Sequence, residues 1–149
     1  MRTAQAAGAA ALLLVASSTR GASSDLIKVE SHSPAAAHGR LVEDVGIETL
    51  GGVFTPLLER GRAVPCEVTE TFSTAADNQV EIEIRPFRGV AKLVRDTKPL
   101  GRFVVTGLPR APRGTLNVAV TFAVASDGTI TLEAREKSGR PVQLRRRDG

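Results

Sequence analysis

Two short stretches have residue types that suit the binding of a ligand rather than catalysis. The first, residues 46–52 (Gly-Ile-Glu-Thr-Leu-Gly-Gly), is an alternating piece that ends in a glycine pair able to supply the positive φ of a tight hairpin turn. The second, residues 72–79 (Phe-Ser-Thr-Ala-Ala-Asp-Asn-Gln), ends a strand pattern in a small polar loop. Loops of this kind carry binding more often than packing. For either stretch alone, residue types favour an ordinary structural turn over a binding segment, and both interpretations stay open.

The chain has no recognisable catalytic or metal-binding set. Cys66 is the only cysteine, which excludes an intramolecular disulfide and a cysteine-cluster zinc site, and beside Pro65 it is typical of a small filler. His32 and His38 lie in a low-complexity region and are poor candidates for a ligand or a base. No glycine-rich phosphate loop of the Walker type occurs. We therefore expect no catalytic and no metal-binding residues.

Length and composition favour one β-rich domain. The 149 residues suit a single domain, and 42% of them are hydrophobic, which is enough for a core. Aromatic residues make up 3%, with no Trp or Tyr, so we expect a core of Val, Leu, Ile and Ala with a few Phe. The net charge of +4 raises the alternative of a nucleic-acid partner. Because the arginines are scattered and stacking aromatics are scarce, we expect no nucleic acid.

From Val45 onward, apolar residues recur at alternate positions, which predicts β-strands. Pro86 should interrupt one strand or place it at an edge, and Asp127-Gly128 predicts a hairpin turn. About eight short strands with turns at short intervals predict an all-β fold, an antiparallel β-sandwich. The expected strands cover residues 45–49, 53–58, 68–73, 80–85, 91–94, 101–106, 116–124, 130–134 and 142–144.

The first 40 residues differ from the rest. Residues 1–22 have the layout of a secretory signal, and a disordered alanine-rich extension is the alternative. The apolar run is too short to span a bilayer, so we expect no membrane span. Residues 23–39 are rich in Ser, Ala and His and predict a linker with little to bury. We thus expect a signal-like or disordered segment over 1–40 and a domain over 41–149.

Four stretches in this order resemble one family. They are residues 46–53, residues 72–79, Leu100-Gly-Arg-Phe103 and residues 109–114 (Pro-Arg-Ala-Pro-Arg-Gly). Together they resemble the β-sandwich substrate-binding domain of the 70-kDa heat-shock chaperones of the DnaK type, over about residues 41–147. Residues 41–45 resemble the family's linker to its ATPase domain, but a short Pro- and Leu-bearing piece is missing before Gly46. We expect this to shorten the first strand, leaving the domain marginally stable or prone to associate through an open edge.

The resemblance implies a cleft that holds an extended peptide by backbone hydrogen bonds and one pocket for an aliphatic side chain. Leu50 and Ala75 match the arch residues that close over the peptide, and Ile82 matches the pocket floor. The alternative for the buried positions is that they are ordinary core residues. The matching pocket walls are Ile47, Phe72, Ile84 and Val118. Polar contacts to the peptide backbone are expected from Thr49, Ser73 and Gln79.

The resemblance does not extend to the family's ATPase domain or its helical lid. Asp77 and Arg113 match positions of the latch to that lid, and we expect them to have no partner in this chain. We expect a non-enzymatic chain that holds no cofactor, whereas the full-length family uses ATP and Mg. The expected function is ungated binding of extended hydrophobic segments of unfolded proteins, with co-chaperones as further partners. A structural β-domain with a defective cleft, or a basic nucleic-acid binder, is the alternative.

The family implies a cytoplasmic location, and the N-terminal segment, if it is a true signal, implies the secretory pathway.

Overall fold

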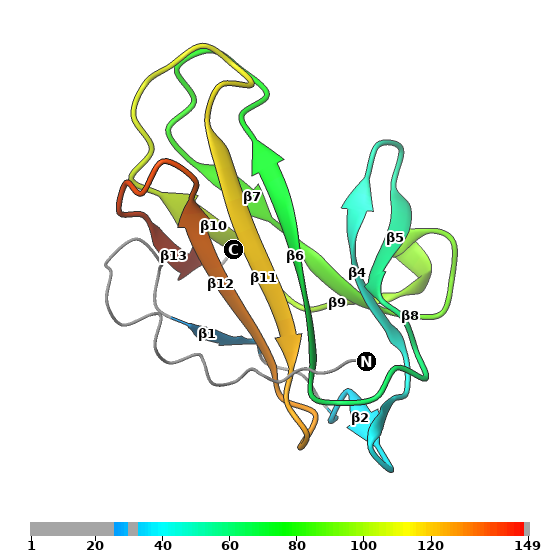
Figure 1. Ribbon diagram of the computed structural model, residues 1–149. Helices are drawn as coiled ribbons and strands as arrows, with labels where there is room; N and C mark the ends of the chain where they lie inside the picture. Colours follow the sequence, from blue (N-terminus) through cyan, green and yellow to red (C-terminus); the bar gives the residue numbers. More distant parts are fainter. Residues whose placement is uncertain (1–25, 30–32, 148–149) are drawn as a thin grey trace.

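The computed structural model describes residues 26–29 and 33–147, and its fold is all-β (Figure 1). The predicted signal-like stretch lies outside the described residues. A short 3-10 helix, η1 (Val94–Asp96), interrupts the strands. The strands are β1 (Ile27–Val29), β2 (Ala36–Ala37), β3 (Arg40–Leu41), β4 (Asp44–Thr49), β5 (Val53–Leu58), β6 (Cys66–Ser73), β7 (Ile82–Ile84), β8 (Pro86–Gly89), β9 (Lys98–Pro99), β10 (Phe103–Thr106), β11 (Asn117–Val124), β12 (Ile130–Glu136) and β13 (Gln143–Arg146).

All strand pairs are antiparallel, and they form a layered arrangement around one core. The sheet orders are β1-β12-β11-β6, β13-β10-β7, β5-β4-β8-β9 and the small pair β2-β3. Side chains alternate along the long strands, so that β6, β11 and β12 each turn one row inward. The largest fully buried side chains include Phe103, Phe122, Leu58 and Ile84. This confirms the predicted sandwich and its aliphatic core with a few Phe.

The expected turns form where the glycines supply positive φ. Gly51 and Gly52 have φ of 83° and 77°, and the Gly52 N–H donates to the Thr49 carbonyl over 3.1 Å, which closes the β4–β5 hairpin. Gly128 has φ of 89° in the β11–β12 turn. There the Asp127 carboxylate accepts a hydrogen bond of 2.9 Å from the Thr129 N–H. Both hairpin predictions are confirmed.

Pro86 marks the point where the chain changes sheets. β7 pairs with β10, whereas β8 begins at Pro86 and pairs with β4 and β9. Proline has no N–H to donate, and the first residue of a strand is one of the few places a sheet tolerates it. The predicted interruption is confirmed, and the chain continues as a strand of the second sheet.

The predicted strand at residues 91–94 is wrong. This segment leads into η1, where the Thr97 N–H and hydroxyl both donate to the Val94 carbonyl, over 3.0 and 2.7 Å. Leu93 makes an isolated β-bridge to Val53, and the Phe54 N–H donates to the Lys92 carbonyl over 2.9 Å. The segment therefore lies beside β5 without forming a strand of its own. The expectation of weakened edge pairing at the first strand also differs from the structure. β4 has six residues and pairs with β5 on one side and β8 on the other.

β4 reaches this central place through Gly46. A Cβ at Gly46 would lie 2.1 Å from the Thr55 carbonyl oxygen, so only glycine fits beside β5 at the bulge.

The stretch expected to be a linker is partly built into the fold. β1 pairs with β12 at the edge of the longest sheet, and Val29 is buried there. Ala35 is fully buried, and its N–H donates to the Gly128 carbonyl over 3.2 Å. The described part of residues 23–39 thus contributes core residues, contrary to the expectation of little burial. The sequence did not reveal this because short Ala- and Ser-rich segments carry no strand periodicity.

Candidate functional site

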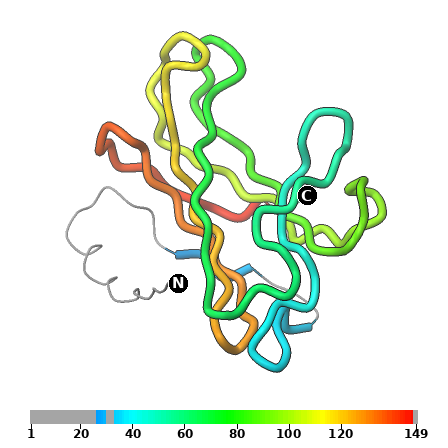
Figure 2. Tube along the Cα trace, turned by 45° about the vertical axis from the view of Figure 1, so that its right-hand side comes forward, coloured from blue at the N-terminus to red at the C-terminus, as the bar shows by residue number. Residues whose placement is uncertain are grey.

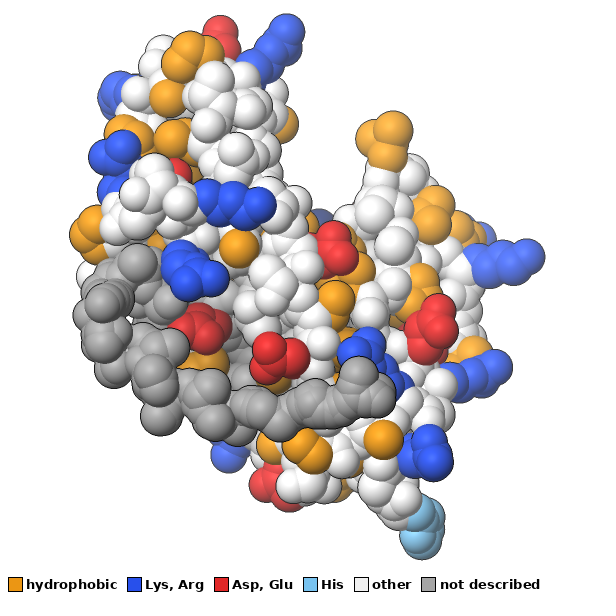
Figure 3. Space-filling view, in the orientation of Figure 1, with side chains coloured by type: hydrophobic (Ala, Val, Ile, Leu, Met, Phe, Trp, Pro, Cys, Tyr) orange, Lys and Arg blue, Asp and Glu red, His pale blue; other side chains and the backbone are white. Residues whose placement is uncertain are grey.

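Two projections of the molecule carry the predicted binding residues. One is the β4–β5 hairpin, and the other combines residues 74–79 with residues 109–115 at the end of the β6–β11 pair; both views show them apart (Figures 1 and 2). The space-filling view shows an open notch between them (Figure 3). Leu50 at the hairpin tip is 97% exposed, so it touches almost nothing. The two expected arch residues, Leu50 and Ala75, therefore flank an open notch rather than close over it.

The loop of residues 74–79 is shaped by Gln79. Its side-chain oxygen accepts hydrogen bonds from the N–H groups of Ala75 and Ala76, over 2.9 and 3.1 Å. Its amide nitrogen donates to the Glu81 carbonyl over 2.7 Å. A glutamine supplies both a donor and an acceptor, so one side chain fixes both ends of the loop. This presents Ala75 at an exposed position.

The second projection is fastened across its two loops. Gly114 N–H donates to both the carbonyl and the hydroxyl of buried Thr74, over 3.0 and 3.1 Å. The Asp77 carboxylate accepts a hydrogen bond of 3.0 Å from the Arg113 N–H. The expectation that Asp77 has no partner in this chain is therefore wrong, because the carboxylate holds the neighbouring loop. The roles of Asp77 and Arg113 toward a lid stay a prediction.

The three predicted polar contacts are engaged within the chain. The Thr49 and Thr55 hydroxyls lie 2.9 Å apart, and the Ser73 hydroxyl donates to the Leu116 carbonyl over 2.6 Å. The Gln79 side chain holds its own loop, as described above. A bound peptide backbone would therefore form hydrogen bonds with the main chain of these segments or with the unused lone pairs of the hydroxyls.

The predicted apolar pocket residues converge on the core. Phe72 and Val118 face each other across β6 and β11, while Ile82 and Ile84 lie on the same side of β7. Ile82 is 5% exposed, and Ile84 and Val118 are more deeply buried. Ile47 and Phe72 are half-buried and pack against this core. The structure thus joins all the expected apolar pocket residues to one cluster, with Leu50 and Ala75 standing apart from it.

Among the described residues, little supports nucleophilic catalysis or metal binding. Burial raises the pKa of the Cys66 thiol, which disfavours the reactive thiolate. Within residues 26–29 and 33–147, no group of His, Cys, Asp and Glu is placed to hold a metal ion. No helix within the described residues is long and apolar enough to cross a membrane.

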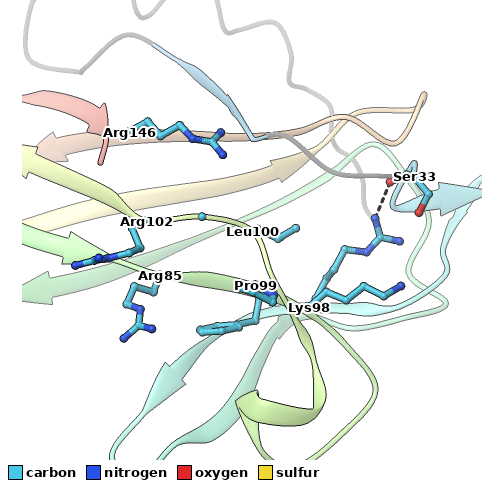
Figure 4. A pocket seen from close by; sticks show the side chains of 10 residues that line it. Ser33, Arg85, Lys98, Pro99, Leu100, Arg102 and Arg146 are labelled. Atoms are coloured by element: carbon cyan, nitrogen blue, oxygen red, sulfur yellow. Dashed lines mark hydrogen bonds between the residues drawn. The ribbon is translucent and has the colours of Figure 1, made fainter. Parts of the chain in front are cut away.

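Sequence reasoning missed a second concave feature, lined largely by cations. A cavity of about 630 Å³ lies beside β8 and β9 (Figure 4). Its cations come from separate parts of the chain, so no local sequence motif predicts that they lie together. The lining residues are Ser33, Arg85, Phe87, Arg88, Lys98, Pro99, Leu100, Gly101, Arg102 and Arg146. Arg88 is the one buried cation among them, and a buried arginine within a short strand has no distinctive sequence signal.

Comparison with known proteins places the β-domain in a family. The family model described as Hsp70 protein matches residues 41–145. The chain belongs to the Hsp70 family. It is 43% identical over 102 residues to the chaperone protein dnaK1 of Synechococcus elongatus, which covers 68% of this chain and 16% of that relative. It is also 43% identical over 101 residues to the mitochondrial heat shock 70 kDa protein of Pisum sativum, covering 67% of this chain and 15% of the relative.

This Hsp70 chain spans about a sixth of the length of the curated relatives it matches. The match begins at Leu41, so β1 and β2 lie outside it. The family match covers both projections and the core between them.

Proposed function

We propose that residues 41–147 form a peptide-binding β-domain that holds short, extended, apolar segments of unfolded polypeptides. The observation that carries the proposal is the open notch between the hairpin tip at Leu50 and the loop at Ala75. An exposed leucine on a turn has no packing role in the domain. Its position beside the notch supplies apolar surface that a peptide lying in the notch would bury.

The energetics fit a weak and tolerant binder. Burying one leucine side chain of the peptide contributes about 1.5–3 kcal/mol. Each backbone hydrogen bond adds about 0.5–1.5 kcal/mol net of water, and ordering the peptide offsets part of the gain. Micromolar affinity corresponds to about 8 kcal/mol and is a reasonable ceiling.

We also propose that these residues bind on their own, without a lid and without nucleotide, and that the chain does not hydrolyse ATP. The sequence has no Walker-type phosphate loop, and the described residues supply no metal-binding carboxylate group. Binding without closure predicts fast exchange of peptide, because the notch lies open (Figure 3).

A second candidate function is a structural β-domain whose cleft does not accept a peptide side chain. Two observations favour it: Ile82 is buried in the core, and the three expected polar side chains are engaged within the chain. The two functions differ in whether a leucine side chain can reach Ile82 from the notch.

Replacing Ile82 with Phe tests the pocket, since aromatic residues are tolerated in strands. The expected result is a loss of about tenfold to a hundredfold in affinity for a labelled peptide with one central leucine, measured by fluorescence anisotropy. The same peptide with Asp in place of its central leucine measures non-specific binding. The matched control is Ile130→Phe, an equally large overpacking of a buried isoleucine on β12, where β12 meets β1 rather than the notch.

Both variants must keep the β signal in circular dichroism. Weakened peptide binding in Ile82→Phe alone supports the peptide-binding function. If the parent binds no peptide, the structural β-domain is the better description. If Ile82→Phe stays folded and binds the peptide as tightly as the parent, the assignment of Ile82 to the pocket is wrong.

A further inference from the structure

The cation-lined cavity beside β8 and β9 has a composition that neither the core nor the notch explains. Five of its lining residues that the structure describes are cationic and none is acidic. Figure 4 shows Arg146 on one side, Lys98 on the opposite side, and Pro99 and Leu100 between them. Its volume of about 630 Å³ falls within the usual range for small-molecule sites. A cavity with cations at its rim and apolar residues in its floor suits an organic anion.

One wall of the cavity is rigid. Arg88 is 3% exposed and donates to the Glu43 carboxylate and to the Ser33 carbonyl, each over 2.7 Å. It also reaches the Pro34 carbonyl over 3.3 Å. A buried guanidinium held by several acceptors is a fixed positive charge. Ser33, whose carbonyl forms part of this wall, lies outside the family match, which begins at Leu41.

Two other cations are held loosely enough to turn toward a ligand. Arg85 lies 3.6 Å from Glu48 with its side chain 51% exposed. Lys98 lies 3.8 Å from Glu43 with its side chain 66% exposed. Exposed ion pairs at such distances contribute little, so exchanging them for contacts to a ligand costs little. Arg102 is more firmly paired, at 2.6 Å from Glu83.

The charged side chains that line the cavity are all of one sign. Glu43, Glu48 and Glu83, which pair with Arg85, Arg88, Lys98 and Arg102, are not among the lining residues. The floor is apolar, formed by buried Phe87 and Leu100 with Pro99. A concave surface lined by charges of one sign raises the local concentration of anions.

We propose that this cavity is a second binding site, separate from the notch, for a small organic anion carrying two or more phosphate or carboxylate groups. Arginine matches both groups through paired hydrogen bonds, and Lys98 adds a point charge. Phosphate and carboxylate sources share this chemistry, and the probes below separate them.

The test is isothermal titration of the full chain with pyrophosphate and, separately, with citrate, at low salt. The pocket variant is Arg85→Gln with Lys98→Gln. The matched control, Arg135→Gln with Lys137→Gln, removes one arginine and one lysine at exposed positions outside the cavity lining. Nitrogen-edited NMR of the same samples shows which backbone amides shift, and circular dichroism confirms the fold.

We expect the pocket variant to lose about tenfold or more in affinity and the control less than about twofold, because only the pocket pair lies within a few ångströms of the ligand. Shifts should centre on Phe87 and residues 98–102. Binding of pyrophosphate alone would identify phosphate chemistry, and comparable binding of both probes would identify a general polyanion site. Equal weakening in both variants, or no binding of either anion at millimolar concentration, would overturn the proposal.

Discussion

At the scale of single residues, exposure separates those available for binding from those that hold the fold. Leu50 stands free at the hairpin tip, whereas Thr49 and Gln79 are occupied by bonds within their own turns. The Asp77 carboxylate accepts a hydrogen bond from the neighbouring loop. On the same short segments, therefore, some side chains are exposed beside the notch and available for binding, whereas others form the hydrogen bonds that fix the turns.

Replacing Leu50 with Ser should weaken peptide binding without changing stability. Because the side chain contacts almost nothing in the free domain, the free energy of unfolding should change by less than about 0.5 kcal/mol. Affinity for the leucine peptide should fall several-fold as the apolar contact is lost. Urea denaturation and fluorescence anisotropy measure the two effects. The control is Val90→Ser, at an exposed position outside the β4–β5 hairpin and outside residues 74–79 and 109–115. An equal loss of affinity in this variant would show a non-specific effect.

Glu136 should make stability depend on acid pH. Burial raises the pKa of this carboxyl, but hydrogen bonds from the Ser138 hydroxyl and from the Ser138 and Arg140 N–H groups outweigh it, and the net pKa is lowered. A lowered pKa in the folded state means that the stabilisation is present above the unfolded carboxyl's pKa, about 4.3. It is lost as pH falls through the lower folded value.

The Glu136→Gln variant should therefore be less stable than the parent at pH 7, by about 1–3 kcal/mol, and the difference should shrink below pH 4. Urea midpoints across pH 3–7 measure it. Ser138→Ala, which removes one donor and keeps the two N–H groups, should fall between the two proteins. A constant difference at all pH values would contradict the role of the charge.

At the scale of elements, the N-terminal segment is the main departure from expectation. β1 closes the outer edge of β12, and the residues that follow are held at Gly128 and Arg88. Open strand edges promote association, and a short covering strand is one way in which proteins avoid it. The segment that precedes the family match therefore protects one side of the sandwich.

Removing residues 1–29 should uncover the β12 edge. We expect the melting temperature to fall by about 5 °C or more, because β1 includes buried Val29. We also expect self-association, seen by size-exclusion chromatography with light scattering. A shorter deletion of residues 1–25 keeps β1 and should behave like the parent. If the longer deletion stays monomeric with an unchanged melting temperature, β1 does not stabilise the domain.

At the scale of the whole molecule, two concave features of different chemistry lie on one small β-domain. The notch is flanked by apolar Leu50 and by a polar loop, whereas the cavity beside β8 is lined by cations. Hydrophobic and main-chain contacts respond weakly to salt, and charge pairing responds strongly.

Peptide binding should therefore be nearly independent of ionic strength. Between 50 and 300 mM salt we expect less than about a twofold change in affinity for an uncharged leucine peptide, since no ion pair forms. Anisotropy titrations over this range measure it. A steep loss of peptide affinity with salt would instead indicate that the net charge of +4 drives the binding.

The sequence by itself determined most of the strands after Val45, the hairpins at Gly51-Gly52 and Asp127-Gly128, and the interruption at Pro86. These follow from local alternation and from backbone angles that few residues adopt, so neighbouring residues suffice to predict them. The sequence motifs also pointed to the family and to the candidate positions on both projections.

Only the tertiary structure decided which polar groups are already satisfied and what covers the edges. The Asp77 carboxylate holds the adjacent loop at Arg113, which lies 36 residues further along the chain. Gln79 bonds within its own loop, and this depends on the folded conformation of the loop. β1 became a strand because β12 offered an unpaired edge, not because three residues favour one alone. The cavity likewise exists only where Arg88, Lys98 and Arg146 are brought together by packing. Long-range pairing and side-chain burial have no local signature, and this is why the sequence could not give them.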